Sequence, residues 1–78
     1  MVNSIVRVTW HDAFADTRSW IEVSEIDQEP CVTVSVGFLI PEAKKGHVTI
    51  AQSFNSEETI DSVLFIPQAM IVKTELLS

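Results

Sequence analysis

The C-terminal segment, residues 63–77, most constrains how this chain of 78 residues can fold. It reads VLFIPQAMIVKTELL, so two apolar runs rich in β-branched residues flank a short stretch that begins at Pro67. Proline fixes its backbone and has no N–H to give to a sheet, which predicts a strand, a single turn and a last strand. Two strands joined in this way are typical of small, strongly bent β-barrels. The segment predicts an architecture and no chemistry.

Three earlier segments, residues 2–10, 31–40 and 47–54, alternate apolar and polar residues as half-buried strands do. The residues that share a face are Val6, Val8 and Trp10 in the first segment and Val32, Val34 and Val36 in the second. At Gly37 the alternation gives way to a continuous apolar run, residues 38–40. A glycine inside a strand often marks a bend, so we expect the sheet to curl there and cover both faces of this run.

The remaining pattern completes the predicted fold. Residues 20–23 are typical of a short strand start, and residues 24–27 predict one helical turn with Ser24 as its N-cap, ended by Pro30. Residues 11–16 and 55–61 are expected to be loops. The prediction is an all-β protein of one domain, residues 1–78, whose five strands form a small, strongly bent antiparallel barrel with one short helical turn.

The apolar content is high for so short a chain. Hydrophobic residues make up 46% of the sequence while only two glycines are present, so large side chains carry the apolar load. A domain of this size has too little interior to bury all of them. We therefore expect part of the apolar surface to lie at a subunit interface, most simply in a symmetric homo-oligomer.

The chain is acidic, with a net charge of −6, and the acids concentrate in one segment. Arg18 is the only basic residue opposing the six acids of residues 12–29, which are Asp12, Asp16, Glu22, Glu25, Asp27 and Glu29. Phosphate backbones attract the opposite charge, so general nucleic-acid binding is disfavoured. The acidic segment is expected either to keep an apolar protein soluble or to meet a basic partner.

Cysteine and hydropathy bear on the compartment. Cys31 is the single cysteine, so an intramolecular disulfide and a cysteine-rich zinc site are both excluded. Its neighbours are acidic, which favours a buried, inert thiol. The sequence has no apolar run long enough to cross a membrane and no signal-peptide pattern at its N-terminus. These features predict a cytoplasmic protein that does not bind membranes.

The adjacent residues His11 and Asp12 are the nearest approach to a reactive pair, because a carboxylate can orient an imidazole for general-base work. Neighbours in a strand point to opposite faces, however, and no serine or cysteine is placed as a nucleophile. We interpret Asp12 as a turn residue. His11 and His47 lack the spacing of metal ligands. The sequence therefore predicts no enzyme activity, no catalytic residues, no metal and no cofactor.

The two tryptophans are the main candidates for binding. In so small a barrel at least one of Trp10 and Trp20 should be in the core, and the other could line a groove. Arg18 lies two residues before Trp20, and together they could form a corner that stacks on a planar ligand or holds an anion. The predicted ligand-binding or partner-binding residues are Trp10, Asp12, Arg18 and Trp20.

Four parts of the chain carry a resemblance to a known group. VTWHDA at residues 8–13, Trp20, SVGFL at residues 35–39 and IPQAMI at residues 66–71 resemble a group of small uncharacterised bacteriophage proteins. The order of elements is also similar to that of Sm-like barrels, which often assemble into rings. The resemblance implies a protein of the host cytoplasm that binds something of the host. It assigns no activity to any residue, since fold does not fix function.

Three functions remain open. The first is a binding module that engages or inhibits a host protein through an acidic or aromatic surface. The second is an oligomer that sequesters a small nucleotide signal of host defence; the dispersed cations would then have to meet at a symmetric interface, and they are Arg7, Arg18, Lys44, Lys45 and Lys73. The third is a minor structural or assembly protein.

Overall fold

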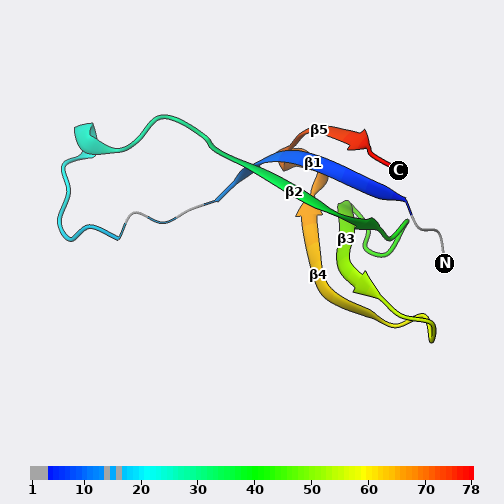
Figure 1. The fold of residues 1–78 in the computed structure, drawn as a ribbon. Coiled ribbons are helices and arrows are strands. Elements are labelled where there is room, and N and C mark those ends of the chain that lie inside the picture. The colour runs from blue at the N-terminus through cyan, green and yellow to red at the C-terminus, as the bar shows by residue number, and fades with distance from the viewer. Residues whose placement is uncertain (1–3, 14, 16) are drawn as a thin grey trace.

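The structure is a computed structural model that describes residues 4–13, 15 and 17–78 (Figure 1). Its elements, in chain order, are β1 (Ile5–Asp12), the 3-10 turn η1 (Val23–Glu25), β2 (Cys31–Leu39), β3 (His47–Phe54), β4 (Ile60–Pro67), the 3-10 turn η2 (Gln68–Met70) and β5 (Ile71–Leu76). The strands form one antiparallel sheet in the order β4-β3-β2-β1-β5. The predicted all-β class with five antiparallel strands is confirmed. Among the described residues no ladder joins β4 to β5, so closure into a barrel stays a prediction.

The segment 63–77 folds as predicted, with η2 between β4 and β5. The first strand differs from its prediction at its end. Residues 11 and 12 were expected in a loop, but β1 continues through them because Asp12 pairs with Cys31 at the start of β2. Residues 2 and 3, which the prediction included in this strand, lie outside the described residues.

The prediction of a strand start at residues 20–23 is wrong. Trp20 has a φ of 49°, in the left-handed region, and Val23 already begins η1. The predicted helical turn is present, but Glu22 rather than Ser24 precedes it, and no side chain caps it. Residues 17–30 leave the sheet, so the β-prone residues 20–23 have no neighbouring strand to pair with, and local turns form instead.

β2 divides the sheet into two halves. It pairs with β1 along its whole length, from Asp12↔Cys31 to Ile5↔Phe38, but it pairs with β3 only at Phe38↔Ala51 and Leu39↔Ile50. Before Phe38, β2 follows β1 and diverges from β3 (Figure 1). The strands β5, β1 and β2 therefore form one half, β3 and β4 form the other, and the end of β2 joins them.

Gly37 lies at the point where β2 meets β3. A Cβ atom there would lie 2.9 Å from the backbone oxygen of Ala51 and 3.2 Å from the Cβ of Ile50. Gly37 is not among the residues with positive φ. Glycine is therefore required at this position because the space beside it is filled, and not because the backbone adopts a conformation reserved for glycine.

The core lies between the two halves. Its buried residues are Val6, Val8 and Trp10 from β1, Ile50 from β3 and Ile66 from β4, with Leu39, Val48 and Ile71 packed against them. The predicted inward face of the first strand is thus confirmed. So few buried side chains leave large apolar residues exposed over the rest of the described chain.

Thr49 gives a prediction that concerns this interior. It is 2% exposed, and its hydroxyl has no hydrogen-bond partner among the described residues. A buried hydroxyl without a partner loses its hydration and gains nothing in return. We expect Thr49→Val to stabilise the protein by about 1 kcal/mol, measured as the urea midpoint of unfolding.

The matched control is Thr33→Val, because the Thr33 hydroxyl lies 4.0 Å from the Cys31 sulfur and is only partly buried. That variant should gain nothing. A loss of stability in Thr49→Val would show that the hydroxyl makes a bond in solution.

Candidate functional site

The described residues between β1 and β2 (13, 15 and 17–30), the projecting loop, extend away from the sheet beyond the ends of both strands (Figure 1). The described chain is accordingly elongated, with extents of 52 × 22 × 21 Å. The loop is held by short-range bonds. The N–H of Glu25 donates to the oxygen of Glu22 at 2.9 Å, and the N–H of Ile26 donates to that of Val23 at 3.2 Å. Its shape is therefore set by local turns, without the support of the core.

Arg18 joins two parts of the projecting loop. Its Nη2 donates to the backbone oxygen of Glu25 at 3.3 Å, and its Nη1 lies 3.8 Å from the Glu25 carboxylate. Both side chains are about half exposed, so the ion pair itself contributes little stability. The contact joins residue 18 to residue 25, and Trp20 belongs to the segment between them.

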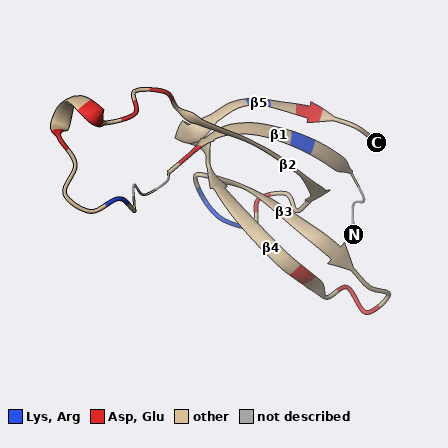
Figure 2. Cartoon of the chain, turned by 60° about the vertical axis from the view of Figure 1, so that its left-hand side comes forward, with Lys and Arg blue, Asp and Glu red and all other residues tan. Residues whose placement is uncertain are grey.

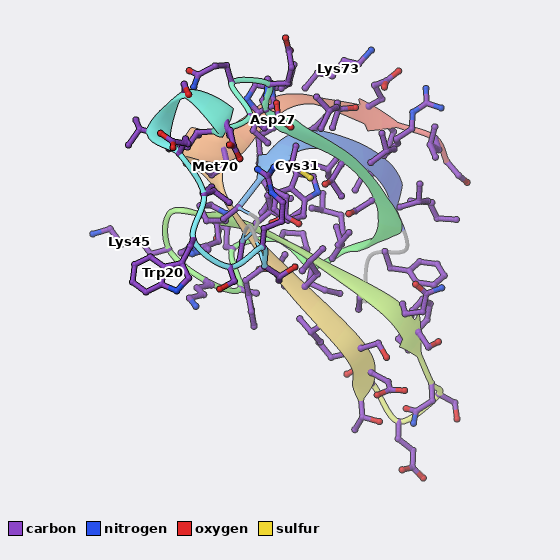
Figure 3. The ribbon with its side chains drawn as sticks, turned by 90° about the vertical axis from the view of Figure 1, so that its left-hand side faces the viewer. Trp20, Asp27, Cys31, Lys45, Met70 and Lys73 are labelled. Carbon is purple, nitrogen blue, oxygen red and sulfur yellow. The ribbon has the colours of Figure 1, made fainter. Side chains whose placement is uncertain are left out.

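Trp20 is the most exposed large apolar residue described. Its relative exposure is 101%, and in Figure 3 its ring stands clear of the ribbon. Val23 is 82% exposed on the same loop, and Ile26 is also exposed. Three uncovered apolar side chains therefore lie within seven residues of one projecting segment. Tryptophan is among the side chains that supply most of the energy of protein–protein contacts.

Acidic groups surround this apolar surface. The loop contains Glu22, Glu25, Asp27 and Glu29, all exposed, and Figure 2 shows acidic positions on both sides of η1. The carboxylate of Asp27 accepts the N–H of Glu29 at 2.9 Å, so it also shapes the turn that precedes β2. The electrostatic character of the loop is negative, with apolar side chains between the charges.

The four predicted site residues divide into three places. Trp10 is in the core, where its indole N–H donates to the Ser35 hydroxyl at 3.0 Å. Asp12 is half-buried at the end of β1. Arg18 and Trp20 are both on the projecting loop and apart from Trp10, and the Arg18 guanidinium contacts Glu25. A binding corner made by Arg18 and Trp20 stays a prediction. Val23 and Ile26 are exposed on the same loop as Trp20. The three apolar residues recur every three positions within an acidic segment, and the sequence prediction did not use this pattern.

The other reactive groups stay apart. His11 and Asp12 are consecutive residues of β1 and therefore point to opposite faces of the sheet. In the described part of the chain, no three histidine, cysteine or carboxylate groups come together as metal ligands would. Cys31 is partly exposed, not buried as predicted.

A hollow of about 380 Å³ lies beside the turn between β2 and β3. Its lining residues are Glu42, Lys44, Lys45, Gly46, His47 and Gln68. The Lys44 ammonium lies 4.7 Å from the centre of the Phe65 ring, and His47 Nδ1 lies 2.8 Å from the Lys45 oxygen. The sequence prediction treated this segment as a hairpin tip, and the contribution of η2 to the hollow could not be seen from the local sequence.

The best-formed ion pair is structural. Arg7 on β1 donates two bonds to the Glu75 carboxylate on β5, at 3.1 and 2.9 Å. These bonds hold the pKa of Glu75 below its ordinary value, and the same carboxylate raises the pKa of Arg7. The pair ties the first strand to the last on the outer surface of the sheet and faces neither the loop nor the hollow.

No protein-family model, curated protein or solved structure matches the chain. Within the described residues, no helix has the length and apolar character required to cross a membrane.

Proposed function

We propose that the chain is a non-enzymatic binding module and that its projecting loop contacts a partner protein. The observation that carries this proposal is the uncovered apolar surface of Trp20, Val23 and Ile26 on an acidic segment outside the core. The separation of His11 from Asp12 on opposite faces of β1 supports a binding role over general-base chemistry.

The exposed tryptophan has a physical cost that binding would remove. A tryptophan side chain can bury about 150–250 Å² of surface, so covering Trp20 would be strongly favourable. The bond from Arg18 to the backbone oxygen of Glu25 connects the loop on either side of Trp20 and restricts its backbone. A segment already restricted in this way loses less conformational freedom when it binds.

The charge of the loop restricts the partner. The loop offers apolar side chains between carboxylates, which fits an apolar groove bordered by lysine or arginine. Opposite charges would speed the encounter and make it sensitive to salt. The resemblance to small bacteriophage proteins favours a bacterial host protein as the partner. The resemblance to Sm-like barrels likewise favours closure of the sheet and assembly of several copies.

The test is purification of tagged protein from a bacterial lysate, in parallel with Trp20→Ala and a control, Val72→Ala. Val72 is an exposed valine on β5, remote in sequence from the loop. A protein captured by the wild type and by Val72→Ala should be lost with Trp20→Ala. The purified partner should bind at least about 30-fold more weakly to Trp20→Ala, and its affinity for the wild type should fall as salt rises.

Two results would contradict the proposal. One is a partner that is captured equally well by Trp20→Ala. The other is a partner whose binding does not respond to salt, because the acidic loop would then not be the contact.

A second candidate function is the sequestering of a small nucleotide. The hollow beside η2 favours it, since Lys44, Lys45 and His47 are grouped there. Cationic side chains grouped in a hollow can bind phosphate groups, although the carboxylate of Glu42 also lines this hollow. Native mass spectrometry of gently purified protein distinguishes this function by an additional mass of nucleotide size that is lost in Lys44→Ala.

A further inference from the structure

β2 has an edge that no other strand covers. Its ladder with β3 includes only Phe38 and Leu39, so residues 31–36 are paired with β1 on one side alone. The side chains of Val32, Val34 and Val36 are all exposed as well, at 58%, 56% and 48%. The three valines therefore lie on a part of β2 that has no second strand beside it, and their side chains are exposed.

The hydrogen bonds determine which backbone groups face this edge. The N–H of Leu39 donates to Ser4 on the β1 side, and the N–H of Ile40 donates to Thr49 on the β3 side. Backbone groups alternate from side to side along a strand. The even-numbered residues of β2 therefore direct their N–H and C=O groups toward the uncovered edge, and Val34 is at its centre.

This edge lacks the features that prevent strands from pairing. Natural sheets protect exposed edges with charges, proline or bulges. Residues 31–39 read CVTVSVGFL and contain no charged residue and no proline. Valine and threonine, both strand-forming residues, occupy most of the uncovered part. A strand of this composition requires a cover.

The total exposed area of the described chain is large enough to include such an interface. The described structure exposes 5897 Å². A folded monomer of 8.7 kDa is expected to expose about 4,700 Å², which leaves an excess of about 1,200 Å². A stable interface buries about 800 Å² on each partner. Part of this excess belongs to the projecting loop, and the total is of the size that one interface between two copies of the chain would bury.

We propose that two copies of this chain pair through the uncovered edges of their β2 strands, antiparallel about a two-fold axis at Val34. Val34 then faces Val34 of the second copy, and Val32 faces Val36. The two halves β5-β1-β2 join into a continuous six-stranded sheet. The six valines lie together on its outer face, where β-branched pairs across strands are stabilising.

The ends of the uncovered segment select this register. About a two-fold at Val34, Pro30 falls opposite Phe38 of the second copy. Proline has no N–H to donate, and the outward groups of Phe38 are already paired with Ala51. Pairing between the two copies therefore stops at Pro30 opposite Phe38 at each end, and the whole uncovered edge between these residues is paired.

The space beside the edge suits the second copy. A hollow of about 270 Å³ opens where β2 diverges from β3, with Val36 on one side and Ile50, Ala51 and Leu64 on the other. In the proposed register, Val32 of the second copy arrives beside Val36. The start of the incoming strand would thus cover the mouth of this hollow and the buried residues below it.

The test compares Val34→Lys with Val72→Lys by analytical ultracentrifugation across a range of concentrations. Both valines are 56% exposed, so the two substitutions change the folded monomer to a similar degree. Val34→Lys loses two buried valines and opposes two like charges at the axis, so dimerisation should weaken by roughly 100-fold. Val72→Lys should dimerise as the wild type does. Because each copy carries a net charge of −6, added salt should strengthen the wild-type dimer.

A disulfide cross-link tests the register directly, in a Cys31→Ser background. Residues directly opposite in a hydrogen-bonded antiparallel pair have Cα atoms about 5.5 Å apart, within the range that a disulfide spans. Val34→Cys should form a covalent dimer on mild oxidation, and Val72→Cys should not. A wild type that remains a monomer at its highest soluble concentration would overturn the proposal. So would a dimer that Val34→Lys leaves intact, or one that cross-links through Val72→Cys.

The interface does not depend on the proposed partner contact, because it uses none of the exposed apolar residues of the projecting loop. Trp20→Ala should leave the dimer unchanged. Failure of one proposal is therefore distinguishable from failure of the other.

Discussion

Trp10→Ala is expected to destabilise the protein by about 3–5 kcal/mol, the usual cost of removing a buried tryptophan. A chain of 78 residues has a total stability of about 4–12 kcal/mol, so this variant should lose a large share of its stability, and all of it at the lower end of that range. Trp10 packs with Val6, Val8, Ile50 and Ile66, and these few residues make up the buried core of the described chain.

Two control variants distinguish the loss of packing at Trp10 from the loss of its hydrogen bond and from the removal of any tryptophan. Trp10→Phe keeps most of the volume but leaves the Ser35 hydroxyl without its donor, so we expect a loss of about 1–2 kcal/mol. Trp20→Ala removes a fully exposed ring and should leave the urea midpoint unchanged. Circular dichroism and urea denaturation measure all three variants. A Trp10→Ala protein as stable as the wild type would show that the two halves of the sheet do not pack around this residue.

Gly37→Val is expected to cost about 3 kcal/mol, because a side chain at this position meets backbone atoms that cannot move aside. The nearest atom to a Cβ would be the oxygen of Ala51, and that residue is held in ladders with both β2 and β4. The expected result is a fall in melting temperature of more than about 10 °C. Gly37→Ala should show a smaller loss in the same direction.

Gly46 provides the matched control for Gly37, because its position favours glycine through its backbone conformation and not through a lack of space. Its φ is +73° and no atom lies within 4 Å of a Cβ built there. Asparagine tolerates this backbone region, so Gly46→Asn should be nearly neutral, whereas Gly37→Asn should be strongly destabilising. Equal effects at the two glycines would refute the distinction between a filled space and a special backbone conformation.

The sequence was sufficient to predict the strands and the inward face of β1, because both depend on local alternation and on the proline of residues 63–77. It singled out Gly37, but it could not show why glycine is needed there, since the obstacle is a carbonyl oxygen from β3 that only the folded chain brings near. Residues 20–23 were predicted as a strand start because their composition suits a strand. Strand formation also needs a neighbouring strand, and local composition does not contain that information.

The candidate site was partly accessible from the sequence for a similar reason. The presence of Arg18 and Trp20 on one loop follows from their spacing of two residues, and the acidic character of the loop follows from composition. The sequence did not show which tryptophan is buried. Trp10 is in the core because it is on a strand of the sheet, and Trp20 is exposed because its segment leaves the sheet. The uncovered edge of β2 depends on where β3 diverges, which is a property of the whole sheet.

The pairing of β1 with β5 has a consequence for how the chain folds. The N–H of Leu77 donates to the oxygen of Ile5, so the first and the last described strands are neighbours although about seventy residues separate them in the sequence. The β3–β4 pair can form early, because it is local. The half that contains β1 can be completed only after β5 has been synthesised, and contacts between such distant segments slow folding. Val6 and Val8 therefore remain exposed during synthesis for longer than the residues of the local hairpin, and the nascent chain is most prone to aggregate in that interval.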